Sequence, residues 1–106
     1  MRKTKQFHFT LAAALLLSAT LGMAQSGQDT YKTKCAMCHG ATGMADSGAG
    51  KAMKVKPATN PEVKKMAESE MIAAVTNGMG KMQPFKGKLT ESQIKQSVEY
   101  FRTFAK

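Results

Sequence analysis

The clearest hydrophobic pattern lies at the C-terminal end of the chain, where apolar residues recur with the period of an α-helix. Residues at i, i+4, i+7 and i+11 form one apolar helical face, which consists of Ile94, Val98, Phe101 and Ala105. The residues just before this face have the form of a capping box, in which Thr90 and Gln93 each bind the backbone N–H of the other. The sequence therefore predicts a helix over residues 90–105.

Three more helices are predicted, over residues 28–38, 60–66 and 69–77. The residues expected to cap their first turns are Ser26, Asn60 (followed by Pro61) and Ser69. Gly78 follows the third of these helices and is a residue type that commonly ends a helix.

Two glycine-rich stretches, residues 40–56 and 77–89, separate the predicted helices. Neither stretch has a helical period, so both are expected to be loops. No stretch alternates apolar and polar positions in the manner of a β-strand. The predicted fold class is all-α, in a single domain with helices at both ends.

The first 24 residues have the pattern of a secretory signal peptide. A basic segment without acidic residues, 1–10, precedes a short apolar segment, 11–21, and small residues then lead to Ala24. We expect cleavage after Ala24, which leaves a domain of residues 25–106 in the periplasm, without stable insertion in the membrane. An uncleaved membrane anchor is the alternative, but the apolar segment is shorter than the ~20 residues that span a bilayer.

Size and charge change the picture once this segment is removed. Of the 106 residues, 82 remain, and the net charge falls from +9 to +6 because three of the 16 basic residues and none of the seven acidic ones are lost. A domain this small commonly needs a metal, disulfides or a cofactor for stability. The remaining segment has no tryptophan, two tyrosines and three phenylalanines, so we expect a bound group to fill part of its interior.

The stretch Cys35-Ala36-Met37-Cys38-His39 contains both cysteines and the one histidine of residues 25–106. A redox-active disulfide normally follows a strand, and none is predicted here. Zinc would need a fourth ligand, and adjacent Cys38 and His39 point poorly at one tetrahedral centre. Covalent haem attachment uses all three residues, with thioethers at Cys35 and Cys38 and His39 as the proximal iron ligand. We therefore predict one covalently bound haem c, with its iron, per chain.

The second axial position of the iron has several candidates. No second histidine remains in residues 25–106, so a methionine sulfur is the expected ligand. Met79 and Met82 lie some forty residues after His39, in a glycine-rich stretch stiffened by Pro84, which can reach the opposite haem face. Met82 is the predicted distal ligand, Met79 is its rival, and an open or otherwise ligated iron is the remaining alternative.

Together these residues are similar to those of the small bacterial class I cytochromes c. The segment "YKTKCAMCHG" resembles the family's attachment segment, and "NGMGKMQPFKGKLTESQI" resembles its methionine loop and the entry to its last helix. The resemblance implies a cytochrome c-like fold of three to five helices around one haem. It also implies that the first and last helices pack together at Gly27 and Tyr31, with Tyr100 opposite, and that a backbone carbonyl near Pro57 accepts a hydrogen bond from His39.

The sequence departs from the family pattern at three positions. Gln83 stands between Met82 and the following proline, which the family often has directly after the ligand. Met79 stands where a lysine is common, which keeps it as a rival ligand. Ser97 replaces a usual apolar residue of the last helix, so a looser helix contact is expected.

A His/Met iron without an open position indicates electron transfer rather than catalysis. We predict a monomeric, exported one-electron carrier between respiratory or other redox partner proteins, and not an enzyme. One alternative is a five-coordinate or labile-methionine haem protein with small-ligand binding or peroxidase-like activity. A haem-free C-x-x-C thiol oxidoreductase is the other.

The lysines of the two loops bear on the choice of partner. If they surround an exposed haem edge, they would steer the protein to an acidic docking surface; otherwise they only solvate a small domain. These residues are Lys51, Lys54, Lys56, Lys81, Lys86 and Lys88. Nucleic acid is not an expected partner, because the chain is predicted to be exported and lacks the pattern of aromatic and basic residues that is typical of nucleic-acid binding.

Overall fold

The computed structural model describes residues 26–106, so the predicted signal segment, residues 1–24, lies outside the described part. Residues 26–34 are helical. The elements that follow are α2 (Ala36–His39), α3 (Gly48–Ala52), α4 (Pro61–Lys65), α5 (Glu68–Asn77), α6 (Glu91–Arg102) and a 3₁₀ turn (Thr103–Ala105). Residues 26–106 contain no strand and only two isolated β-bridges, which confirms the all-α prediction.

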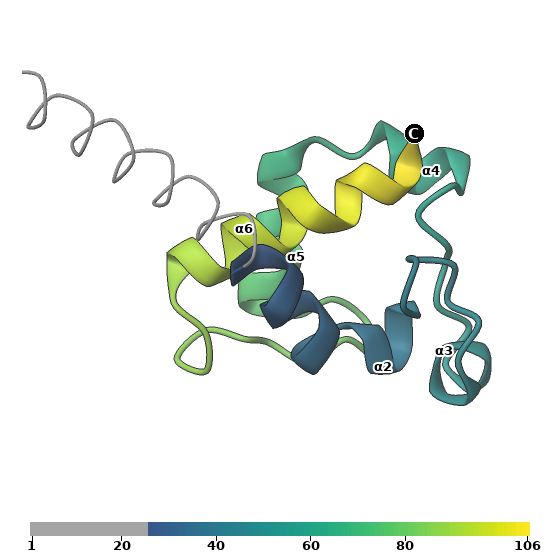
Figure 1. Cartoon of the computed structure of the whole chain (residues 1–106), viewed down its shortest axis with the longest axis horizontal. Helices are drawn as coiled ribbons and strands as arrows, with labels where there is room; N and C mark the ends of the chain where they lie inside the picture. The colour runs from purple at the N-terminus through teal and green to yellow at the C-terminus, as the bar shows by residue number, and fades with distance from the viewer. Residues whose placement is uncertain (1–25) are drawn as a thin grey trace, which may run out of the picture.

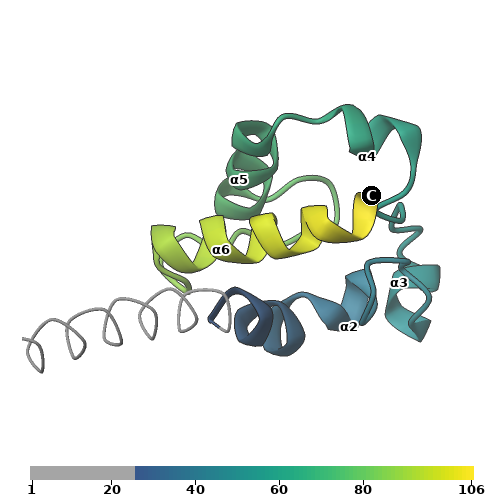
Figure 2. The same cartoon turned by 45° about the horizontal axis from the view of Figure 1, so that its top comes forward.

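The long helix α6 is the central element of the arrangement. In Figure 2 it runs between α4 and α5 on one side and the first helix and α2 on the other. Figure 1 shows the chain returning to α6 through the loop that follows α5. Helix α6 therefore has helices on both sides, and the loop after α5 leads into its start.

Capping residues explain the starts of α6 and α4. The Thr90 hydroxyl accepts a hydrogen bond from the Gln93 N–H at 3.1 Å, and the Gln93 side chain accepts one from the Thr90 N–H at 2.9 Å. The Asn60 side chain accepts from the Glu62 N–H at 2.9 Å, with Pro61 as the first helical residue. Both predicted helix starts are confirmed, and each satisfies backbone donors that have no partner inside the helix.

Two predicted caps are wrong. Ser69 lies inside α5, which begins at Glu68, because the Glu70 side chain accepts a hydrogen bond from the Ala67 N–H and closes the first turn earlier. Ser26 likewise lies within the first helix. That helix also ends sooner than predicted, with a turn at Cys35 before the separate short helix α2.

The prediction of a loop over residues 40–56 is wrong for Gly48–Ala52, which form α3. Ser47 caps this helix, because its hydroxyl accepts a hydrogen bond from the Gly50 N–H at 3.0 Å. Two glycines among five residues lower helix propensity, and they concealed a helix that depends on contacts with its neighbours.

The first helix packs against α6 where the resemblance places the contact. A Cβ on Gly27 would lie 2.7 Å from the carbonyl oxygen of Gln96, so only glycine allows this approach. The ring of Tyr31 is 5.3 Å from that of Tyr100 and 5.6 Å from that of Phe104, measured between centroids. The predicted contact between first and last helix is therefore confirmed.

Ser97 is buried in this region without an unsatisfied hydroxyl. Its side chain is 3% exposed, and its hydroxyl donates a hydrogen bond to the Ile94 carbonyl at 2.9 Å. A serine can bond to a carbonyl of the preceding turn and so satisfy its polar group within its own helix. The polar residue therefore has a partner at this apolar position, and a looser helix contact stays a prediction.

We predict that Gly27→Ala destabilises the protein relative to Gly48→Ala. Both changes replace a helical glycine and gain similar helix propensity, but a Cβ on Gly48 meets nothing within 4 Å. The clash with the Gln96 carbonyl should make Gly27→Ala less stable than Gly48→Ala by about 1–3 kcal/mol. Chemical denaturation of both variants measures the difference, and equal midpoints would contradict the proposed need for glycine at the crossing.

Candidate haem-attachment and ligand site

Three predicted site residues share one turn of helix. The His39 N–H donates to the Cys35 carbonyl at 2.9 Å, and the Cys38 N–H donates to the same oxygen at 3.2 Å. Cys35, Cys38 and His39 therefore stand at i, i+3 and i+4, positions that lie on one face of a helix. This turn, residues 35–39, is called the attachment turn below, and it directs two sulfurs and an imidazole to the same side.

The thiols of the attachment turn are free and half-buried. Burial, and then the neighbouring Cys38, raise the pKa of Cys35 to about 11. Thiol oxidoreductases instead depend on a lowered thiol pKa, which supplies the reactive thiolate. The environment of Cys35 therefore argues against the thiol oxidoreductase alternative.

The imidazole of His39 is half-buried, in surroundings that suit an iron ligand. Its ring lies 5.2 Å from that of Phe101, edge to face. Burial lowers the pKa of His39, so the ring is neutral at neutral pH and has a lone pair available for a metal. Its Nδ1 atom is fully buried and has no hydrogen-bond partner within residues 26–106. These features fit the haem that the attachment turn predicts.

The role predicted for Pro57 stays a prediction. Its carbonyl accepts a hydrogen bond from the Asn60 N–H at 3.0 Å. A carbonyl oxygen has two lone pairs and can accept a second hydrogen bond, so this contact leaves room for the imidazole of His39.

Neighbouring segments hold the backbone of the attachment turn, and the sequence did not reveal these contacts. The Ser47 hydroxyl donates to the Met37 carbonyl at 2.6 Å, and the Ala45 N–H donates to the His39 carbonyl at 2.8 Å. The Tyr31 hydroxyl donates to the carbonyl of Gly40 at 2.6 Å. Ser47 was the one available signal, since serine is a common helix cap, but the glycines after it favoured a loop.

The two candidate distal ligands face each other across a tight hairpin. The Met79 N–H donates to the Met82 carbonyl at 3.1 Å, and the Met82 N–H donates to the Met79 carbonyl at 3.0 Å. Residues paired in this way project their side chains to the same side. Met79 is 59% exposed, whereas Met82 is half-buried. Burial therefore favours Met82 as the residue directed toward the interior.

Backbone contacts with α5 fix the position of this hairpin. The Phe85 N–H donates to the Val75 carbonyl at 2.9 Å, and the Lys86 N–H donates to the Thr76 carbonyl at 3.1 Å. Gly78 ends α5 with φ of 81°, and a Cβ there would lie 2.9 Å from the carbonyl oxygen of Met82. Glycine at this position thus allows the methionine hairpin to fold back on the end of α5.

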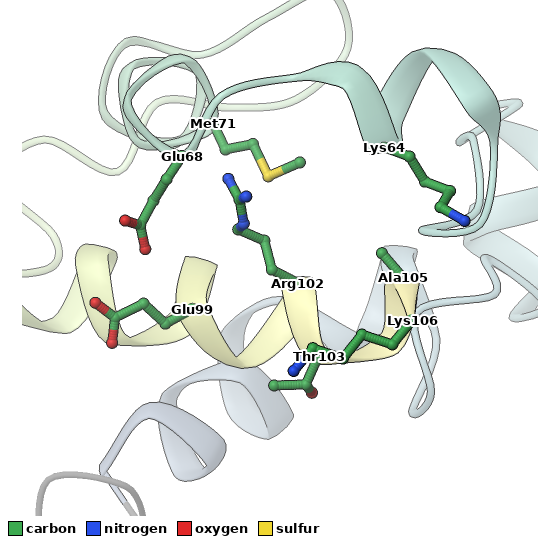
Figure 3. A pocket seen from close by; sticks show the side chains of 8 residues that line it. All are labelled: Lys64, Glu68, Met71, Glu99, Arg102, Thr103, Ala105 and Lys106. Carbon is green, nitrogen blue, oxygen red and sulfur yellow. The ribbon is translucent and has the colours of Figure 1, made fainter.

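A pocket of about 400 Å³ lies elsewhere, between α4, α5 and the end of α6. Figure 3 shows the Arg102 side chain extending into it toward Met71. None of the predicted haem residues lines this pocket, so it is distinct from the attachment turn and the methionine hairpin. Met71 is 8% exposed, as expected of a core residue.

Residues 26–106 contain no cluster of three or more His, Cys, Asp or Glu side chains arranged to hold a metal ion. Within the same residues, no helix combines the length and apolarity needed to cross a membrane.

Comparison with known proteins assigns the chain to a family. Residues 22–101 match the family described as cytochrome c oxidase, cbb3-type, subunit III. The chain is 40% identical over 78 residues to the cytochrome c6 of Leptolyngbya boryana, covering 74% of this chain and 87% of that protein. The solved structure of the KustC0563 c-type cytochrome matches with a TM-score of 0.69 and 29% identity, over 76% of this chain and 98% of that one. The chain therefore belongs to the small class I c-type cytochromes, electron-transfer proteins that carry covalently bound haem c.

Proposed function

We propose that residues 25–106 form an exported, monomeric cytochrome that carries one electron between redox partner proteins in the periplasm, after cleavage of the signal at Ala24. The observation that carries this proposal is the single helical face shared by Cys35, Cys38 and His39, with an imidazole whose buried Nδ1 atom has no hydrogen-bond partner within residues 26–106. When bound, haem iron supplies one-electron exchange between its ferric and ferrous states.

We propose a role for each site residue. Cys35 and Cys38 would form the thioethers, and His39, neutral because partial burial lowers its pKa, would be the proximal ligand. Met82 is the distal ligand, supported by its half-burial and its place in a hairpin bonded to α5. Met79 is the rival, because it projects from the same side of the hairpin. The carbonyl of Pro57 is proposed as the acceptor that orients His39.

The same arrangement favours a carrier over a haem enzyme. A firmly held thioether ligand would leave no position on the iron for a substrate. It would also keep the change in geometry between the ferric and ferrous states small. The methionine hairpin is bonded at both ends, by Gly78 to α5 and by Phe85 to Val75. The peroxidase-like alternative requires a methionine that dissociates easily from iron. The hydrogen bonds that hold this segment on α5 oppose such dissociation.

The proposed partners have acidic docking surfaces. The six loop lysines identified in the sequence are all exposed, and Lys56 alone among them forms an ion pair within residues 26–106, with Glu62. Met37, which stands between the two cysteines, is 75% exposed. An exposed apolar side chain and exposed lysines are the components of a transient interface that has an apolar centre and a charged rim.

The haem and ligand assignments predict distinct results for two methionine variants. Protein exported from a host with a haem-attachment system should show the mass of residues 25–106 plus one haem. Met82→Ala should retain that mass but lose the ferric absorption band that reports methionine–iron bonding, because the sulfur is removed. Met79→Ala, the matched control in the same hairpin, should keep the band.

The outcomes separate the parts of the proposal. Loss of the band in Met79→Ala but not in Met82→Ala would exchange the two ligand roles. High-spin ferric bands in the unaltered protein would favour the open-site alternative. A colourless exported protein without added mass would refute the cytochrome proposal as a whole.

The docking proposal predicts that the loop lysines accelerate reaction with anions. The reduced protein should transfer an electron to hexacyanoferrate(III), an anion, at a rate that falls as salt is added. Lys54→Glu with Lys81→Glu should lower this rate by roughly tenfold at low salt. Lys64→Glu with Lys95→Glu, which changes the net charge equally on α4 and α6, should have a much smaller effect. Equal losses in both pairs would mean that net charge alone steers the reaction.

A further inference from the structure

We infer that the α3 segment, residues 45–53, positions the attachment turn, and that Ser47 and Gly50 are positioning residues for the ligand His39. This inference rests on the proposed roles of Cys35, Cys38 and His39. It concerns a segment that the sequence predicted to be an unstructured loop, and it assigns to two of its residues an effect on the haem site.

The attachment turn cannot hold its conformation alone. Helix α2 contains four residues, none of them buried, and no side chain caps its start. A helix so short is unstable in isolation, because forming its first turn costs more than its few hydrogen bonds return. The start of the turn is joined to the first helix, because the Cys35 N–H donates to the Tyr31 carbonyl at 2.9 Å. Its far end, which brings Cys38 and His39 to one face, must therefore be held by contacts with other segments.

The backbone carbonyls at the end of α2 identify those segments. The last four carbonyls of a helix have no partner inside it and must be satisfied from outside. The Gly40 N–H donates to the Ala36 carbonyl at 2.8 Å. The other three carbonyls are contacted from the α3 segment: the Ser47 hydroxyl lies 2.6 Å from the oxygen of Met37 and 3.4 Å from that of Cys38, and the Ala45 N–H donates to His39 at 2.8 Å.

Close packing of α3 on the attachment turn adds a second, independent observation. A Cβ on Gly50 would lie 2.3 Å from the carbonyl oxygen of Cys38 and 2.8 Å from that of Ala45. Both obstacles are backbone atoms, which cannot move without shifting the turn itself. Gly50 is buried, whereas Gly48 on the same helix faces open space. The helix thus presents one glycine, and not the other, to the turn.

The contact extends to the sulfur of Cys38. Met53, which ends α3 by donating its N–H to the Ala49 carbonyl, places its Sδ atom 3.9 Å from the Sγ atom of Cys38. The α3 segment therefore meets the attachment turn through a hydroxyl, a backbone amide, a glycine and a thioether. Displacing it would loosen His39 and expose the Cys38 sulfur to water. Greater polarity around a metal site lowers its reduction potential by favouring the more highly charged oxidised form.

The first experiment compares Gly50→Ala with Gly48→Ala in the haem-loaded protein. The measurements are the reduction potential and the hydrogen-exchange rate of the Ala45 amide, which is bonded to His39. Gly50→Ala should lower the potential and speed exchange of this amide by about tenfold, the size expected of overpacking against backbone. Gly48→Ala should match the unaltered protein in both. Equal behaviour of the two variants would overturn the inference.

A second pair of variants covers the case in which Gly50→Ala does not fold. Ser47→Ala removes the hydroxyl that donates to the Met37 carbonyl, and should lower the potential with about fivefold faster exchange of the Gly50 amide. Ser47→Thr retains a hydroxyl and should restore the values of the unaltered protein. Ser69→Ala, at an exposed serine of α5, is the control. Faster exchange in Ser47→Ala without a change in potential would reduce Ser47 to a purely structural role and contradict the inference.

These results are separable from a failure of the proposed function. If the unaltered protein carries no haem mass, the roles of Cys35, Cys38 and His39 fail, whatever the variants do. If it carries haem and the glycine and serine pairs show no difference, the cytochrome proposal stands and the positioning role of α3 fails.

Discussion

The side chain of Tyr31 is the contact on which both the fold and the site depend. Its ring is 1% exposed and packs against Tyr100 and Phe104, and this packing holds the first helix on α6. Its hydroxyl donates to the carbonyl of Gly40, directly after His39. Burial raises the pKa of Tyr31 well above its usual range, so the hydroxyl keeps the proton that it donates. The crossing of two helices thereby fixes one end of the attachment turn.

The protein part of the interior is small, which explains why a bound haem matters to this chain. Tyr31 and Ile94 are the large side chains that are fully buried within residues 26–106. The ligand candidates His39 and Met82 are half-buried by the protein's own side chains. A flat, mostly apolar group in contact with both would supply apolar contacts that so short a chain cannot make by itself. Stability and electron transfer therefore depend on the same bound group.

The sequence predicted those features that depend on local chemistry. The capping box at Thr90 and the Asn60–Pro61 start were correct because each is made by residues adjacent in the chain. The C-x-x-C-H spacing was sufficient to predict the cofactor, since positions i, i+3 and i+4 share a helical face. Resemblance, rather than periodicity, supplied the crossing at Gly27.

What the sequence could not reveal depends on contacts between distant segments. Helix α3 was missed because its glycines oppose helix formation locally, and it is held by the carbonyls of the attachment turn ten residues earlier. The start of α5 was displaced because the Glu70 side chain closes its first turn. The sequence alone does not show whether a hydroxyl such as that of Ser47 will bond to a backbone carbonyl or to water.

The methionine hairpin, Met79 to Met82, keeps its backbone contacts although Gln83 separates Met82 from the proline that the family often has directly after the ligand. The segment begins at Gly78, whose N–H donates to Ala74, and ends at Phe85, whose N–H donates to Val75, so both ends are fixed on α5. Gln83 and the proline after it are exposed. They lie between Met82, where the hairpin ends, and Phe85, so the extra residue before the proline falls outside the hairpin. The reciprocal bonds of the hairpin are therefore retained, and the position of Met82 depends on its backbone contacts rather than on a proline directly after it.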